Sequence, residues 1–319
     1  MVVNKLRKSI KECNSLEEVE MILKLYDIQI KKTSTGVDYA SMLAYDGVDK
    51  MDAKIWQFTP SMRNKLDSGE VYVVSGRTKE YQGKIQLNIK DIRNVTPEDN
   101  VDLDNFYEKA KMNSDELKEG INDYFKEIDD PILKNIVSVL LKKHFDAFFE
   151  YPAAVTIHHN YYYGLAYHTY SMLSLAKKYL ENYKFINKDL VYAGIILHDV
   201  GKVTELSGPK GTEYTKTGKL LGHIVIGLNE VYATACDLEV ENTEEVLNLL
   251  HIIASHHGEL EYGSPKVPQT PEAELVHLLD YSDSRLAALE DEVTKTDKGE
   301  FTHQLFAFDR KMFYVPDVK

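Results

Sequence analysis

Residues 20–95 show short runs in which apolar and polar positions alternate. Alternation at every second residue is typical of strands with one buried face. The clearest of these runs are Ala53–Phe58, Val71–Ser75 and Ile85–Ile89. Turn-forming pairs such as Asp46-Gly47 separate the runs, and Lys79–Lys84 is expected to connect two strands as a hairpin. A short helical piece is predicted over Ser61–Leu66. The spacing therefore predicts about five strands in this part of the chain.

From about residue 104 the apolar spacing changes to three and four, which predicts helices. Asn113 and Glu116 are placed to form a capping box for a helix through Ile128. Asp130-Pro131 starts another helix, with proline at its first position. Gly258 is typical of a helix stop. Further helices are expected near residues 160–181, 187–199, 219–235, 243–257 and 271–291.

These patterns predict a multidomain chain with both α and β structure. A five-stranded β-barrel of the OB type is expected first, because that fold closes about five short strands into a small barrel. An all-α helical bundle is expected to follow it. The predicted segments are a helical extension (1–19), the barrel (20–98), a helical linker (99–130), the bundle (131–292) and a C-terminal tail (293–319).

Composition and charge narrow the function classes. The 319 residues are 43% hydrophobic and 28% charged, which is typical of a soluble globular protein. No apolar run is long enough to span a membrane, so no membrane partner is expected. Cys13 and Cys236 are the only cysteines, which predicts a reducing, cytoplasmic location rather than a disulfide framework. The net charge of −13 argues against nonspecific coating of nucleic acid. Residues 20–98 carry 12 Lys or Arg and 11 Asp or Glu, so a surface that binds a polyanion is expected in this part of the chain rather than in the acidic remainder.

The chemistry is concentrated in the second half, where His198-Asp199 follows the apolar run Ala193–Leu197. A buried ionisable pair is costly unless its charge is compensated, and a metal ion would compensate it. Further residues of ligand type are His168, His223, His256, His257 and Asp280. Asp283 is the rival to Asp280, because both can face one side of a helix. Imidazole and carboxylate ligands without thiolate suit Mn, Fe, Co, Ni or Zn.

The order His…His-Asp…Asp resembles the HD superfamily of metal-dependent phosphohydrolases, whose four defining ligands match His168, His198, Asp199 and Asp280. The added His223 and His256-His257 resemble the two-metal branch of that superfamily. The resemblance implies that Asp199 bridges two ions. It assigns one ion to His168, His198 and Asp280, and the other to His223, His256 and His257. Some two-metal relatives carry Glu one turn before the first His, where this chain has Gly164, so no eighth ligand is implied.

Two ions about 3.5–4 Å apart can activate a water and polarise a phosphoryl group. Asp199 is therefore a candidate catalytic residue as well as a ligand. Lys202 lies three residues after Asp199, and in the superfamily a lysine here commonly contacts the substrate phosphate; the alternative is a solvated lysine after a helix. His158 and His159 are expected to contact phosphate or to donate a proton to the leaving oxygen, or else to cap or pack.

The barrel offers candidate contacts to a single strand, because OB barrels use aromatic stacking beside a basic groove. The candidates are Trp56, Phe58, Lys54, Tyr81 and Lys84, with Tyr72, Arg77, Lys79 and Lys90 as additional ones. Alternation places Lys54, Trp56 and Phe58 on one face of their strand. The alternative is that Trp56 and Phe58 fill the barrel core.

The whole chain resembles the YhaM-type 3′→5′ exoribonucleases. The resemblance is carried by Asp52–Trp56, Gly83–Leu87, His158–His168, Leu197–Lys202 and Ser255–Gly258. It implies Mn-dependent removal of nucleotides from the 3′ ends of single-stranded RNA, and often DNA. It also implies two divalent ions, a cytoplasmic location and a homo-oligomer. Two alternatives stay open: a phosphodiesterase for nucleotides or cyclic dinucleotides, and a DNA-binding, replication-associated protein with minor nuclease activity.

Overall fold

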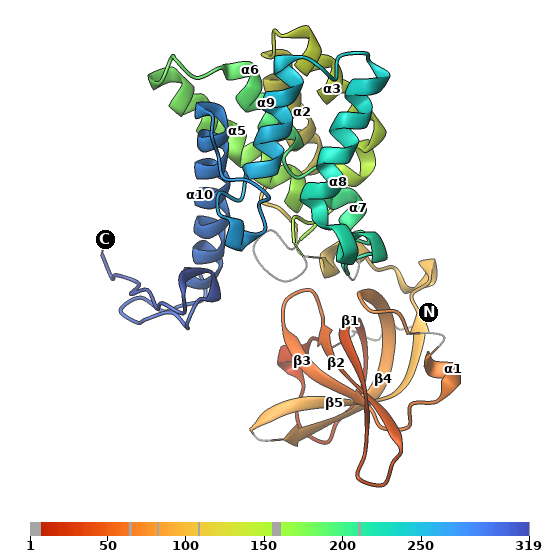
Figure 1. The fold of residues 1–319 in the computed structure, drawn as a ribbon. Coiled ribbons are helices and arrows are strands. Elements are labelled where there is room, and N and C mark those ends of the chain that lie inside the picture. Colours follow the sequence, from red (N-terminus) through yellow and green to blue (C-terminus); the bar gives the residue numbers. More distant parts are fainter. Residues whose placement is uncertain are drawn as a thin grey trace. The chain divides into compact units, whose positions relative to one another are not determined.

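The computed structural model describes residues 8–63, 66–81, 83–107, 109–154, 161–209 and 212–318. The chain divides into two compact units, Met1–Glu108 and Lys109–Lys319. The first is a closed five-stranded barrel and the second is helical (Figure 1). The predicted fold class is therefore confirmed. The division between the units falls later in the chain than residue 98, where the barrel was expected to end.

The barrel closes through one long strand that pairs with two others. Its strands are β1 (Glu18–Lys32), β2 (Asp38–Tyr45), β3 (Lys50–Ile55), β4 (Glu70–Tyr81) and β5 (Lys84–Asn94). The strand order is β1-β2-β3-β5-β4, and β1 pairs with both β2 and β4. The β3–β5 pair is parallel, whereas the other pairs are antiparallel. This closed arrangement fits a barrel of the OB type.

Alternation explains why these segments form a barrel. In β2 the buried positions are Ala40, Met42 and Ala44, at every second residue, and they join the core that fills the barrel. The helix between β3 and β4 is α1 (Pro60–Arg63), which starts one residue before the predicted helical piece. The predicted connection Lys79–Lys84 is mostly strand, because β4 and β5 pair as far as Tyr81 and Lys84.

The predicted helical extension is wrong for the residues described before β1. Residues 8–17 hold one turn of 3-10 helix, Ile10–Glu12, and Glu18 already starts β1. Ile10 is buried in the barrel core, and the backbone N–H of Leu16 donates to the carbonyl of Thr78 on β4. These contacts hold the segment against the barrel.

The second unit is a bundle of helices (Figure 1). They are α2 (Ser114–Lys126), α3 (Pro131–Lys143), α4 (Phe145–Glu150), α5 (Gly164–Asn182), α6 (Lys188–Leu197), α7 (Lys202–Glu205), α8 (Lys216–Asp237), α9 (Glu244–Ser255) and α10 (Pro271–Val293). The Asn113–Glu116 capping box and the Asp130 cap with Pro131 behind it are both present, as predicted. Each such cap typically contributes about 1 kcal/mol to helix stability.

The segment predicted as a linker, 99–130, contributes to the helical core. Leu117 and Ile121 of α2 are fully buried in it, because the apolar face of α2 packs against α5.

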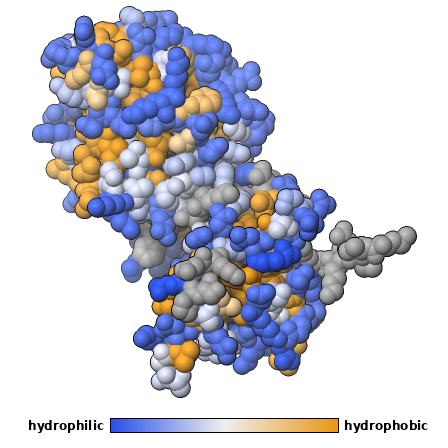
Figure 2. Space-filling view, turned by 90° about the vertical axis from the view of Figure 1, so that its right-hand side faces the viewer, coloured by the Kyte–Doolittle hydropathy of each residue, from blue (hydrophilic) through white to orange (hydrophobic). Residues whose placement is uncertain are grey.

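Beyond α10, the chain folds back through two isolated bridges, Phe301–Tyr314 and Leu305–Lys311. Among the described residues, no helix has the length and apolar character needed to cross a membrane. Apolar patches interrupt the hydrophilic surface on the face drawn in Figure 2.

Candidate functional site

Helix α6 carries the His-Asp doublet into the middle of the bundle. All seven residues from Val191 to Leu197 are buried, and His198 caps the end of the helix. Gly194 lets α6 approach α9 closely, because a Cβ at this position would lie 2.8 Å from a methyl carbon of Ile252. The rings of His198 and His256, at the C-terminal ends of these two helices, are consequently 5.0 Å apart.

Six of the seven candidate ligands gather in two groups. His168, His198 and Asp280 form one group, called triad A below. His223, His256 and His257 form the other, triad B. Within each triad the ligand atoms lie within 4.8 Å of one another. The triads draw on helices far apart in sequence, since α5, α6 and α10 build triad A while α8 and the segment after α9 build triad B.

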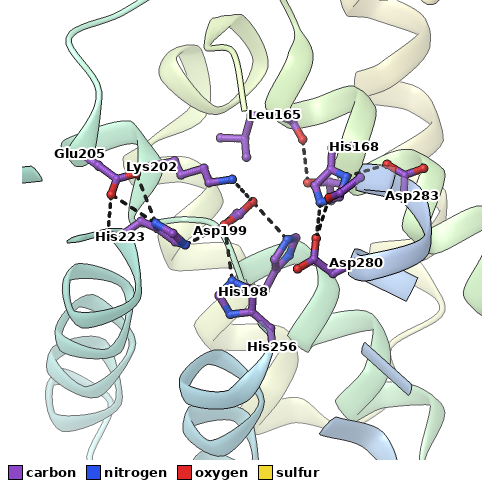
Figure 3. A network of polar contacts seen from close by, with 12 residues as sticks. Leu165, His168, His198, Asp199, Lys202, Glu205, His223, His256, Asp280 and Asp283 are labelled. Carbon is purple, nitrogen blue, oxygen red and sulfur yellow. Dashed lines mark hydrogen bonds and ion pairs between the residues drawn. The ribbon is translucent and has the colours of Figure 1, made fainter. Parts of the chain in front are cut away.

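Asp199 lies between the two triads (Figure 3). Its Oδ2 is 3.2 Å from Nε2 of His198 in triad A. Its Oδ1 is 3.5 Å from Nε2 of His223 and 3.7 Å from Nε2 of His256, both in triad B. One carboxylate thus presents a different oxygen to each triad. This arrangement would allow Asp199 to be a ligand shared by two ions.

Every imidazole in the triads has its Nδ1 engaged on the side away from the centre. The Nδ1 atoms of His198, His256 and His257 donate to backbone carbonyls at 2.7–2.8 Å. Nδ1 of His168 lies 2.7 Å from Asp283, and Nδ1 of His223 lies 3.2 Å from Glu205. A carbonyl or an ionised carboxylate can only accept a hydrogen bond, so these contacts place the proton on Nδ1. Nε2 is then the free nitrogen that faces inward in a neutral ring, as metal ligation requires.

The inward-facing atoms include several that lack a hydrogen-bond partner among the described residues. They are Nε2 of His198, His223 and His256 and Oδ1 of Asp199, all of them buried. Leaving a buried polar atom unpaired costs about 1–3 kcal/mol, so such atoms are rare in folded proteins unless an ion or water satisfies them. The residues present therefore fit divalent metal ions.

The charges of the centre are also consistent with bound cations. Burial alone would raise the pKa of Asp199, but Lys202 and His198 beside it hold that pKa well below its usual range. Burial keeps the pKa of His256 well below its usual value, so this ring is neutral and able to bind a metal. Burial would lower the pKa of His168 too, but hydrogen bonds to Asp280 and Asp283 raise it to about 10. Metal binding at Nε2 of His168 would therefore have to displace the second ring proton, which faces Asp280.

The other residues of the helical unit that the sequence suggested for the site differ in their positions relative to the triads. Lys202 Nζ lies 2.7 Å from Oδ2 of Asp199 and its side chain is only 16% exposed, so it is not a solvated lysine. Asp283 contacts Nδ1 of His168, whereas Asp280 lies 3.2 Å from the inward-facing Nε2. The geometry therefore places Asp280 in triad A and Asp283 behind it. His158 and His159 lie outside the described residues.

Residues 165–285 match the family model of the HD domain. This segment contains both triads and Asp199. An HD domain implies a metal-dependent phosphohydrolase, and HD domains bind divalent metals. The match thus places the two triads and Asp199 within a segment similar to metal-dependent hydrolases of phosphoric esters.

On the barrel, three of the predicted contact residues lie together. Trp56 is 45% exposed, stacks on Tyr39 with ring centroids 5.0 Å apart, and donates from Nε1 to Asn88 Oδ1 (2.8 Å). Lys54 Nζ lies 5.2 Å from the centroid of Trp56 and 5.5 Å from that of Tyr81. We call the five residues Tyr39, Lys54, Trp56, Tyr81 and Asn88 the barrel aromatic surface.

Other barrel candidates are not on this surface. Phe58 packs against the barrel core, because β3 ends at Ile55 and the chain turns before Phe58, whose N–H donates to the carbonyl of Asp38. Its predicted place on one face with Trp56 is therefore wrong. Tyr72 is buried. Arg77 and Lys90 both lie near Glu18. Lys84 is exposed and pairs in register with Tyr81.

Sequence reasoning missed Glu205, Tyr39 and Asn88. Glu205 could have been sought, because a metal-binding imidazole usually has a carboxylate or carbonyl on its other nitrogen. Asn88 contacts Trp56 only because β3 and β5 pair in parallel, with Lys54 opposite Asn88. That pairing joins strands that are not consecutive in the chain, so no local pattern could indicate it.

Removing the metal ions from the HD domain is expected to destabilise the helical unit. A ligand present at about 100 times its Kd stabilises the folded state by about 2.7 kcal/mol. For a unit of this size, that corresponds to a fall in Tm of roughly 5–10 °C on chelation. Differential scanning calorimetry with and without chelator measures the shift, and adding back Mn²⁺ should restore it. Equal Tm values under all three conditions would contradict the metal centre.

Proposed function

We propose that the protein is a metal-dependent 3′→5′ exonuclease that hydrolyses phosphodiester bonds of single-stranded RNA. The two triads, with Asp199 between them, would supply the ligands for two divalent ions. When bound, such ions provide an activated water at neutral pH and positive charge for the phosphoryl oxygens. Mn²⁺ suits the mixture of imidazole and carboxylate ligands, and it is the metal that the resemblance to YhaM-type enzymes implies.

The barrel aromatic surface is the observation that carries the choice of substrate. Trp56 is exposed yet held in one orientation by Tyr39 and by Asn88. An aromatic ring that is already ordered loses little entropy when a base stacks on it. Stacking of this kind is worth about 1–3 kcal/mol per base and tolerates any sequence. A hydrolase that acted only on small nucleotides would have no use for such a surface.

The charges around Trp56 favour a polyanion locally, in spite of the acidic chain. Lys54 lies between the rings of Trp56 and Tyr81, where its ammonium can pair with a phosphate next to a stacked base. Lys79 and Lys84 lie on the neighbouring β4–β5 hairpin, where Lys79 pairs with Gln86 and Lys84 with Tyr81. Stacking rings beside cations are the combination that single-strand-binding barrels use.

The direction of cleavage, 3′→5′, rests on the resemblance alone.

The test is digestion of a 5′-labelled single-stranded RNA with Mn²⁺, using the wild type and Trp56→Ala. We expect the wild type to produce a ladder that shortens from the 3′ end and releases mononucleotides. Trp56→Ala should raise KM for long RNA about 10- to 100-fold, because it removes one stacking contact. Cleavage of a dinucleotide, whose only phosphodiester bond would be held at the helical unit, should be unchanged.

Phe185→Ala is the control, since Phe185 is an aromatic residue of the helical unit and is 74% exposed. It should leave KM for long RNA unchanged. Internal cleavage products would contradict an exonuclease. Turnover of cyclic dinucleotides without turnover of RNA would instead support the small-molecule phosphodiesterase.

A further inference from the structure

Two buried carboxylates lie behind the triads, each next to Nδ1 of one imidazole. Asp283 lies behind His168 on one side of the centre, and Glu205 lies behind His223 on the other side (Figure 3). Each is only 8% exposed. Each triad therefore has one imidazole whose Nδ1 faces a carboxylate, while the remaining imidazoles donate to backbone carbonyls.

The contact of Asp283 is built into the packing of α5 and α10. Oδ2 of Asp283 is 2.7 Å from Nδ1 of His168, and Oδ1 accepts a hydrogen bond from Ser171, one turn further along α5. With both carboxylate oxygens bonded to α5, Asp283 cannot rotate without breaking one of these bonds. The ring of His168 is consequently held with Nε2 towards Asp280 and the centre.

The contact of Glu205 depends on a break in α8. Gly222 has φ 72° and ψ 156°, which are not helical values, and the next residue is His223. Oε1 of Glu205 accepts from the backbone N–H of His223 at 3.0 Å and from its Nδ1 at 3.2 Å. One carboxylate thus holds both the backbone and the ring of this residue.

Glycines let the backbone close around this contact. A Cβ on Gly218 would lie 2.3 Å from the carbonyl oxygen of Glu205, and a Cβ on Gly201 would lie 2.1 Å from that of His223. Real Cβ atoms do not approach that closely, so any side chain would push α7 and α8 apart. The segment is therefore packed around the Glu205–His223 contact.

We propose that Asp283 and Glu205 are positioning residues, each of which orients one imidazole and so sets the affinity of one metal position. Asp283 acts on triad A through His168, and Glu205 acts on triad B through His223. A carboxylate behind an imidazole fixes its tautomer and ring orientation and makes Nε2 a stronger ligand. The inference rests on the two-ion centre of the proposed function, but not on the RNA substrate.

The experiment is a Mn²⁺ titration of the full-length, metal-free protein by isothermal calorimetry, which does not depend on activity. Asp283→Asn and Glu205→Gln keep the shape of each side chain but remove its charge. Each should weaken one of two binding events about 10- to 100-fold and leave the other unchanged. His168→Ala and His223→Ala identify which event belongs to which triad.

Double variants separate positioning from a general effect of charge. In the His168→Ala background, Asp283→Asn should cause no further loss of affinity, because the ring through which it acts is gone. In the His223→Ala background, the same substitution should still weaken the remaining event. Glu274→Gln and Asp237→Asn, which alter exposed carboxylates, are the matched controls and should change neither event.

The outcomes test the two-ion centre and the positioning roles of Asp283 and Glu205 separately. If the wild type binds no Mn²⁺, the two-ion centre itself fails. If it binds two ions but Asp283→Asn or Glu205→Gln binds them as the wild type does, only the positioning inference is overturned. Equal weakening of both events by either substitution would also overturn it, because a general electrostatic effect does not distinguish between triads.

Discussion

Replacing Asp199 by asparagine is expected to lower kcat by at least about 10³-fold. The substitution keeps the shape of the side chain but removes the charge that both triads share. Oδ2 faces His198 and Oδ1 faces His223 and His256, so a single change affects both metal positions. Rates of Mn²⁺-dependent hydrolysis and metal content measured on the same preparations test the prediction.

Asp237→Asn is the matched control, because Asp237 is an exposed aspartate at the end of α8. Its activity and metal content should equal those of the wild type. If Asp199→Asn retained near wild-type kcat with both ions bound, the bridging role of Asp199 would be wrong. An unfolding transition like that of the wild type, with both proteins measured in chelator, shows that any loss is not due to misfolding.

Replacing Lys202 by alanine is expected to lower kcat by about 10²- to 10³-fold. Burial alone would lower the pKa of Lys202, but Asp199 raises it, so the ammonium stays charged beside the centre. A charged group already fixed where negative charge develops stabilises the transition state without reorganisation. Measurement of kcat and KM on one RNA, together with metal content, tests this role.

Metal content decides between two roles for Lys202. If Lys202 contacts the substrate phosphate, Lys202→Ala should lose activity and keep its ions. A variant that lost its ions would show that the lysine serves mainly to neutralise Asp199, 2.7 Å away. Lys219→Ala, at an exposed position on α8, is the control and should behave as the wild type. Arginine is not expected to restore the rate, because its planar fork differs from a compact ammonium.

Much of the centre could be predicted because its signals are local. The run directly before His198, Ala193–Leu197, is apolar, which indicated a buried doublet, and α6 is buried from Val191 to Leu197. Caps at Asn113 and Asp130 start helices through contacts within three residues. The ligand types are chemically distinctive, and their order along the chain resembles a known superfamily. The division of six of these ligands into two triads agrees with the division that the resemblance implied.

Contacts between distant segments could not be predicted. Alternation treats Trp56 and Phe58 alike, but the strand ends at Ile55, so Trp56 stays exposed and Phe58 packs against the barrel core. Asp280 and Asp283 are three residues apart, so both can lie on the same face of a helix and the sequence does not distinguish them. Only the packing of α10 against α5 shows that one faces Nε2 of His168 and the other faces Nδ1.

The order of barrel and helices, the ligand types and the burial of the doublet could all be predicted from the amino-acid sequence, because they depend on hydrophobic periodicity and side-chain chemistry. Tertiary structure alone decided which oxygen of Asp199 faces which triad and which carboxylates lie behind His168 and His223. It also decided which aromatic ring of the barrel stays exposed. These features depend on distances between residues far apart in the chain, which packing sets and local pattern does not encode.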